Sequence, residues 1–393
     1  MKKVLLGFCS FLFFVFLVEG FSFILIKMGR RAYWESGYSP GEIWTHQHAQ
    51  DLAKRSDRIG AISRLILKKS YDQNKSQSSI SQNELRLETP VYENSDKGRS
   101  MYLGPWRLNP NLDENFQVLG TKSSRVKYKV HYSTDEYGNR KGHVVPDSKE
   151  GVLFLGCSFT FGQGVNDEET FPFQFGKRTG LNTYNLGVPG SSPSTILKSL
   201  EEEKVNFPDK LKKEVTTVVL TIIPDHLQRV VGTSSFFGTS ESNYTYYPYY
   251  YLEKGNLVSV PSFAEGGLDK NLTRLLSYSN LMTVSGAEYP VMGDEHYELF
   301  SRLVQKIQSH LRSKLNVKEF IVAIFPTGRS YSQLQKMKTT LIRDGMKVLD
   351  YSFIQAPFLM GDSYYLAYDG HPSPKTYDLF TDLLVLDLTG KSL

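Results

Sequence analysis

A serine in a small-residue turn is the first candidate for chemistry in this chain. The turn spans residues 156–162 and reads Gly-Cys-Ser-Phe-Thr-Phe-Gly, directly after an apolar stretch at residues 152–155 that predicts a buried strand. A serine between a strand and a following helix presents its hydroxyl at the edge of the sheet, where helix-start N–H groups point the same way. The pattern favours Ser158 as a nucleophile, and an ordinary helix-capping serine is the alternative.

A base and its carboxylate partner stand near the other end of the chain. Asp369 and His371 lie two residues apart in a loop, just before an amphipathic stretch at residues 377–386. A serine nucleophile needs a histidine base, and the base needs a carboxylate that fixes its tautomer. We therefore expect Ser158, His371 and Asp369 to form a catalytic triad. Seven other histidines are rival bases, and His226 is the one rival expected near this site.

Taken together, these segments resemble the SGNH (GDSL-type) hydrolase superfamily, in a membrane-anchored bacterial branch related to alginate-acetylation-like, acetyl-handling proteins. Residues 156–158 resemble its nucleophile block, with Cys157 in place of the usual aspartate. Residues 185–190 resemble the second block, and Asp369 with His371 resembles the last one. The resemblance covers residues 130–390 and implies an α/β fold with a serine-dependent activity.

The resemblance also implies an oxyanion hole. Its donors would be the N–H groups of Ser158 and of Gly190, with Gly187 as the alternative glycine. The family's third block carries an asparagine donor, whereas the matching segment here, residues 224–229, has none. His226 is the expected substitute; a hole with two donors, or an impaired site, are the alternatives. Loss of one donor typically lowers the rate about a hundred- to a thousandfold.

The activity implied is a serine esterase that hydrolyses acyl esters, most of all O-acetyl esters of cell-surface carbohydrate. An O-acetyltransferase with the same triad is one alternative, and a non-catalytic glycan-binding or envelope-assembly protein on this scaffold is the other. No cofactor is expected. No metal is expected either, because the close pair His46 and His48 lacks further ligands nearby.

Composition limits the partners and the compartment. The net charge is +5 and the basic residues are spread along the chain, which indicates no nucleic-acid surface. Residues 4–26 are apolar apart from Glu19 and are long enough to cross a bilayer. We read them as an uncleaved signal anchor, with a cleaved signal peptide as the alternative. The remaining chain is then expected to be membrane-anchored and extracytoplasmic, in the periplasm or at the cell surface.

Three regions are expected along the chain: a transmembrane anchor at 1–30, a juxtamembrane segment and polar linker at 31–100, and an SGNH hydrolase-like domain at 101–393. From residue 151, apolar strands alternate with amphipathic helices, which predicts a doubly wound, mainly parallel sheet of flavodoxin-like type flanked by helices. Strands are expected at 152–155, 183–186, 218–223, 320–325 and 347–351; helices are expected at 171–179, 193–205, 295–314, 331–344 and 374–386.

A tyrosine-rich insertion at 230–290 interrupts the alternation, and a hairpin is expected around residues 254–256. Tyrosine rings stack on sugars and their hydroxyls bind polar edges. Tyr247, Tyr249 and Arg229 are therefore candidate substrate-binding residues, and packing of the tyrosines within the insertion is the alternative. Acylated carbohydrate or a small ester would be the substrate.

Overall fold

The chain is described from a computed structural model. The described residues are 14–15, 17–23, 99–101, 106–108, 110–120, 123–146, 148–205, 207–239, 241–325, 331–352, 366 and 370–390. Nearly all of the expected polar linker and most of the expected anchor lie outside them. Within the described ranges, no helix has both the length and the hydropathy required to cross a bilayer.

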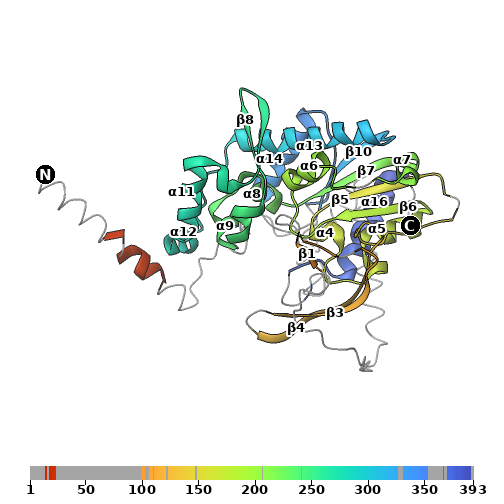
Figure 1. Ribbon diagram of the computed structural model, residues 1–393, viewed down its shortest axis with the longest axis horizontal. Coiled ribbons are helices and arrows are strands. Elements are labelled where there is room, and N and C mark those ends of the chain that lie inside the picture. The colour runs from red at the N-terminus through yellow and green to blue at the C-terminus, as the bar shows by residue number, and fades with distance from the viewer. Residues whose placement is uncertain are drawn as a thin grey trace, which may run out of the picture.

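A five-stranded parallel sheet forms the centre of the molecule (Figure 1). Its spatial order is β11-β10-β7-β5-β6, so the chain reverses its direction of winding beside β5. The strands are β5 (Gly151–Gly156), β6 (Asn182–Gly187), β7 (Val215–Ile222), β10 (Glu319–Ile324) and β11 (Lys347–Asp350). This is the doubly wound order in which ligands bind beyond the carboxyl ends of the strands, at the reversal point.

Helices cover both faces of the sheet because the central strands β5, β7 and β10 carry apolar side chains on both faces. Along β5, Leu153 and Leu155 pack with one helix layer, whereas Val152 and Phe154 pack with the other. The first layer holds α6 (Pro193–Glu201), α8 (Asp225–Val231), α13 (Asp294–Lys314) and α14 (Tyr331–Arg343). The second holds α5 (Phe171–Thr179) and α16 (Pro374–Thr389). A short helix, α7 (Asp209–Glu214), leads into β7.

An antiparallel hairpin lies beside the sheet, in orange at the lower edge of Figure 1. Its strands are β3 (Asp113–Gly120) and β4 (Ser123–Ser133), and a small pair, β1 (Arg99–Met101) and β2 (Trp106–Leu108), precedes it. Leu108 and Tyr132 pack against Phe161, which belongs to the helix that follows β5. The hairpin therefore supports the turn that carries Ser158.

The expected insertion is a helical layer with one hairpin. Its elements are α9 (Ser234–Thr239), α10 (Glu241–Tyr246), β8 (Tyr249–Glu253), β9 (Asn256–Val260), α11 (Gly267–Ser277) and α12 (Asn280–Ser285). The hairpin turn at Lys254 and Gly255 was expected, and both residues have positive φ. Phe236, Tyr247 and Phe263 share an aromatic cluster, so part of the tyrosine-rich sequence packs inside the insertion.

Candidate active site

Ser158 stands at the point where the winding of the sheet reverses. It is the first residue of α4 (Ser158–Phe161), and only Cys157 separates it from the end of β5. The side chain of Thr160 folds back so closely that a Cβ on Gly156 would lie 2.1 Å from its Oγ1. Glycine is therefore required at the end of the strand, and the tight turn places Ser158 above the carboxyl edge of the sheet.

His371 meets this serine from the opposite end of the chain. Its Nε2 lies 2.9 Å from Ser158 Oγ, although the two residues are 213 positions apart. The carbonyl of His371 accepts a hydrogen bond from Leu366 N, and the Phe159 ring lies 5.6 Å from the imidazole between centroids. A histidine nitrogen at this distance is correctly placed to remove the hydroxyl proton.

The expected carboxylate partner, Asp369, lies outside the described residues. The structure therefore shows two members of the expected triad in contact, and the role of Asp369 stays a prediction. Within the described part of the chain, no three His, Cys, Asp or Glu side chains gather as a metal site requires.

Cys157, next to Ser158, is a buried thiol. It is 1% exposed and belongs to the apolar cluster under the turn. Burial raises its pKa, which keeps the sulfur protonated and poorly nucleophilic. Ser158 is thus the better candidate of these two neighbours.

The second block forms the turn after β6. Gly190 has a φ of 82°, and Ser191 N donates to Val188 O at 2.9 Å, which closes the turn. Gly187, the alternative donor, already donates its N–H to Asn185 Oδ1 at 3.0 Å. Neither the Ser158 N–H nor the Gly190 N–H has an acceptor among the described residues. These two groups are therefore the pair available for an oxyanion.

Two candidate substrate-binding residues, Tyr247 and Arg229, form hydrogen bonds to backbone carbonyls of this turn. Tyr247 donates its hydroxyl hydrogen to Gly190 O at 2.5 Å, and Arg229 donates from Nη1 to Ser191 O at 2.8 Å. The Gly190 carbonyl shares its peptide plane with Ser191 N–H, and the Ser191 carbonyl shares its plane with Ser192 N–H. The two bonds therefore fix the chain directly after Gly190 and hold the turn that carries the Gly190 N–H. Tyr249 instead stacks on Tyr251, with ring centroids 5.6 Å apart. Contact of these side chains with substrate stays a prediction.

Removing the Tyr247 hydroxyl is expected to loosen the turn that carries Gly190. Tyr247→Phe keeps the buried ring and deletes the hydrogen bond to Gly190 O. We expect kcat for a small acetate ester to fall about tenfold with KM little changed, as the loss of one buried hydrogen bond allows. Tyr250→Phe is the matched control, because its hydroxyl bonds Glu201 Oε2, away from the turn. Equal kcat values in the two variants would remove Tyr247 from this role.

Gly187 allows the end of β6 to lie close to the backbone of α4. A Cβ at this position would lie 2.3 Å from Phe161 N and 2.7 Å from the Thr160 carbonyl carbon. Backbone atoms cannot yield as a flexible side chain can, so α4 must shift.

Gly187→Ala is therefore expected to displace Ser158 from His371 and to lower kcat about a hundredfold, as a misplacement of about 1 Å can. Esterase assays with circular dichroism on the same samples check this. Gly238→Ala is the control, since its nearest neighbour would be 3.3 Å away. Full activity in a folded Gly187→Ala would show that the close approach does not position the nucleophile.

The sequence reasoning missed a buried arginine that holds the nucleophile turn. Arg140 is 1% exposed and forms an ion pair with Asp167. Its guanidinium also donates to the carbonyls of Gly162 and Val165, at 3.3 and 2.9 Å. Arginine suits this place because its five donors satisfy several acceptors in one plane. The only signal in the sequence was the short turn that carries Arg140, which does not reveal where its side chain reaches.

His226, the expected third donor, lies in the first turn of α8, just beyond the end of β7. It is 0% exposed, and neither ring nitrogen has a hydrogen-bond partner among the described residues. Burial, followed by the charge of Arg229, holds its pKa well below the usual 6.5, so the ring is neutral at pH 7. A neutral imidazole still has one N–H to donate. Whether this N–H reaches an oxyanion stays a prediction.

The same burial predicts a pH-dependent stability. Below pH 6.5 the unfolded chain protonates His226 while the folded chain does not, so the free energy of unfolding falls as the pH falls. The slope from this residue is up to about 1.4 kcal/mol per pH unit.

His226→Phe, which cannot be protonated, is expected to flatten the profile of unfolding free energy between pH 6.5 and the lowered pKa. Urea denaturation at a series of pH values measures the difference. Parallel profiles for the two proteins would mean that folding does not lower the pKa of His226.

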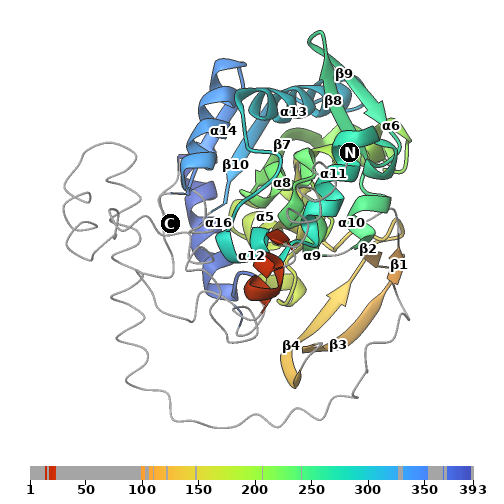
Figure 2. The ribbon, with the colours of Figure 1, turned by 90° about the vertical axis from the view of Figure 1, so that its left-hand side faces the viewer.

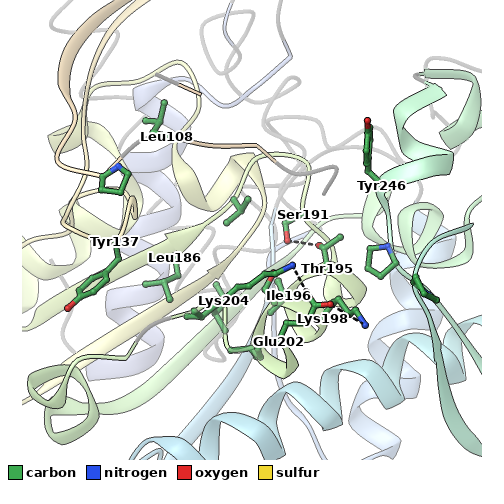
Figure 3. Close-up of a pocket in the computed structure, with 18 residues that line it drawn as sticks. Leu108, Tyr137, Leu186, Ser191, Thr195, Ile196, Lys198, Glu202, Lys204 and Tyr246 are labelled. Atoms are coloured by element: carbon green, nitrogen blue, oxygen red, sulfur yellow. Dashed lines mark hydrogen bonds and ion pairs between the residues drawn. The ribbon is translucent and has the colours of Figure 1, made fainter. Parts of the chain in front are cut away.

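A cavity of about 410 Å³ borders the turn after β6. It is lined by apolar side chains such as Leu108, Leu186 and Ile196, together with Val188 and Ser191 of the turn itself. Figure 3 shows Glu202 between Lys198 and Lys204 at this cavity, and both lysines form ion pairs with it. Neither Ser158 nor His371 is among the lining residues, so the cavity adjoins the turn after β6 rather than Ser158.

Comparisons with known proteins leave the family open. No family model matches the chain, and no curated protein matches it. Among solved structures, one assigned to the G-D-S-L lipolytic family from Desulfitobacterium hafniense DCB-2 has 13% identity and a TM-score of 0.34, covering 60% of this chain and 97% of its own. A G-D-S-L lipolytic family member from Veillonella parvula DSM 2008 has 12% identity and a TM-score of 0.34, covering 62% and 99%. These scores are too low to establish a family.

Proposed function

We propose that the chain is a serine esterase of the SGNH type that works through an acyl-serine intermediate. The observation that carries the proposal is the 2.9 Å contact between Ser158 Oγ and His371 Nε2 at the reversal point of the sheet. A hydroxyl at a sharp strand-to-helix turn, a histidine in hydrogen-bond reach and two backbone N–H groups without an acceptor in the described part of the chain are what acyl transfer requires.

In the proposed reaction, His371 Nε2 removes the hydroxyl proton as Ser158 Oγ attacks the ester carbonyl. The negative charge on the carbonyl oxygen is bound by the N–H groups of Ser158 and Gly190. The alcohol leaves with the proton from His371, and the acyl group stays on Ser158. Water, activated by His371, then releases the acid and restores the serine. Asp369 would accept a hydrogen bond from the other ring nitrogen of His371.

His226 is proposed as the third oxyanion donor in place of the asparagine. Three facts support the assignment: His226 follows the strand next to β5, its ring is neutral, and its nitrogens have no other partner among the described residues. A donor held in a buried, water-free position stabilises a developing oxyanion more strongly than the same donor in water.

The proposed substrate is an O-acetyl ester on cell-surface carbohydrate, and the proposed setting is an extracytoplasmic domain anchored by the apolar N-terminal segment. The tyrosine-rich insertion supports this choice, because Tyr247 reaches the oxyanion turn and Tyr246 lines the adjoining cavity. Arg229 and Tyr249 are proposed to act with them, Arg229 through the turn and Tyr249 through the packing of the insertion.

The test is acetate release from an O-acetylated polysaccharide by the full chain in detergent, with a deacetylated glycan present as an acceptor. Free acetate from the wild type and none from Ser158→Ala would support the esterase. Acetylation of the acceptor without free acetate would show an acetyltransferase with the same nucleophile. Binding of the polysaccharide with neither product would show a non-catalytic glycan-binding protein and overturn the proposal.

A further inference from the structure

The helix α11 presents its apolar stripe to the outside. Leu268, Leu272 and Leu275 recur at helical spacing along one side, and Leu268 and Leu275 are 89% and 67% exposed. The opposite side, which faces the insertion, carries Lys270 and Thr273, at 3% and 0% exposed. Soluble helices normally bury the apolar side and expose the polar one. This inversion indicates a surface that is covered in the working protein.

The buried polar side of α11 is held by specific contacts of Lys270. Lys270 Nζ donates to Val231 O at 3.0 Å and pairs with Asp269 at 3.1 Å. Its ammonium also lies 5.1 Å from the centre of the Tyr249 ring. Buried contacts of this kind fix the rotation of α11 about its axis, and so keep the leucines outside.

The apolar stripe continues beyond α11. Tyr278 follows at the end of the helix with 62% exposure, and Leu281 on α12 is 44% exposed. Contiguous exposed apolar side chains rimmed by polar ones mark an interaction surface. We call the five residues Leu268, Leu272, Leu275, Tyr278 and Leu281 the α11–α12 face.

The apolar N-terminal segment of the same chain lies against this part of the molecule. Glu19 accepts a hydrogen bond from Asn280 N at 2.6 Å and another from Ser279 Oγ, at the start of α12. Figure 1 shows the red N-terminal helix beside α12, and Figure 2 shows it in front of α12 after a quarter turn. A carboxylate within an apolar segment needs such partners, since an isolated charge near lipid is costly.

The N-terminal helix is itself apolar on its exposed side. Phe14, Leu17 and Phe21 are 64%, 56% and 63% exposed, and Phe23 is 49% exposed. The contact through Glu19 joins these side chains to the α11–α12 face, so the two exposed apolar regions lie together. The occupant that would cover both at once is a lipid bilayer, whose interface accepts amphipathic helices lying in its plane.

We propose that the α11–α12 face lies in the membrane interface beside the N-terminal segment. Contact of this face with the interface orients the remaining domain relative to the bilayer, whereas the N-terminal segment tethers it. It is independent of the esterase proposal, because none of these residues contacts Ser158, His371 or the Gly190 turn in the described part of the chain.

A fluorescent label on an introduced cysteine tests this surface in the full chain. Leu275→Cys is made in a Cys9→Ser background; the remaining Cys157 is 1% exposed and should not react. The labelled protein is reconstituted into phosphatidylcholine–phosphatidylglycerol vesicles with lipids that carry a nitroxide near the headgroup. Ile342→Cys is the matched control, since Ile342 is an apolar residue on α14 that is 50% exposed.

The proposal predicts that nitroxide lipids quench the label at position 275 several-fold more than the label at 342, with a blue shift only at 275. Equal quenching at both positions would mean that the N-terminal segment alone binds lipid, and would overturn it. A label at 275 that is shielded as protein concentration rises in detergent, without quenching in vesicles, would show a second copy of the chain on this face and would equally overturn it.

Discussion

Replacing Ser158 with alanine is expected to lower kcat for a small chromogenic acetate by roughly 10⁴- to 10⁶-fold, as loss of a serine nucleophile does. The reason is that the hydroxyl 2.9 Å from His371 Nε2 is removed, while the fold loses a single oxygen. Binding of the ester is expected to persist, because no apolar contact changes. Initial rates at several substrate concentrations measure the effect.

The control for this prediction is Ser309→Ala. Ser309 is a serine on α13 whose hydroxyl bonds Gln305 O at the surface, far along the chain from the turn. It is expected to retain the wild-type rate. Should Ser158→Ala hydrolyse the acetate as fast as Ser309→Ala, the nucleophile has been assigned to the wrong residue.

Replacing His371 with alanine is expected to lower kcat about a hundred- to ten-thousandfold, the usual contribution of a general base. The serine would remain, but nothing among the described residues would take its proton. Hydroxide can partly replace the base, so the residual rate of His371→Ala is expected to rise steadily with pH. Rate–pH profiles of both proteins check this.

His310→Ala serves as the control for the histidine. His310 lies on α13, and its pKa is lowered by partial burial and neighbouring lysines, yet it has no part in the site. Its pH profile should match that of the wild type. A profile for His371→Ala with the wild-type shape would mean that another group serves as the base.

The centre of the sheet was predictable because β5, β7 and β10 are short runs rich in apolar residues. The expected helix at 171–179 matches α5, and the expected strand at 183–186 lies inside β6. The helix expected at 193–205 ends earlier, at Glu201. The cause is local: Glu203 takes a positive φ of 52°, and Lys204 N bonds back to Ser199 O, so the chain turns away.

The helices of the insertion were less predictable because α11 does not bury its apolar side, as helix prediction from periodicity assumes. Periodicity locates a helix by assuming that its apolar side is buried, and α11 instead exposes its leucines while it buries Lys270. The hairpin between β8 and β9 was predictable, since Lys254 and Gly255 form a tight turn with two positive φ values.

The meeting of Ser158 with His371 was expected from the residue types together with the resemblance of their segments to the SGNH hydrolases, since residue type alone left seven other histidines as rival bases. The supports of the site were not, because side chains such as Tyr247 and Arg140 bond to backbone carbonyls. Because every residue has a backbone carbonyl, the sequence does not indicate which one will accept the hydrogen bond. Tyr247 and Gly190 are 57 positions apart, and only the fold brings them together.

The most direct test of the account is the identity of the residue that carries the acyl group during turnover. The full chain is mixed with a chromogenic acetate, quenched in acid within the first turnovers and digested for peptide mass spectrometry. We predict an acetyl group on Ser158 in the wild type and none at this position in Ser158→Ala. Product formation with the acetyl group on another residue, or with Ser158 unmodified throughout, would contradict the account.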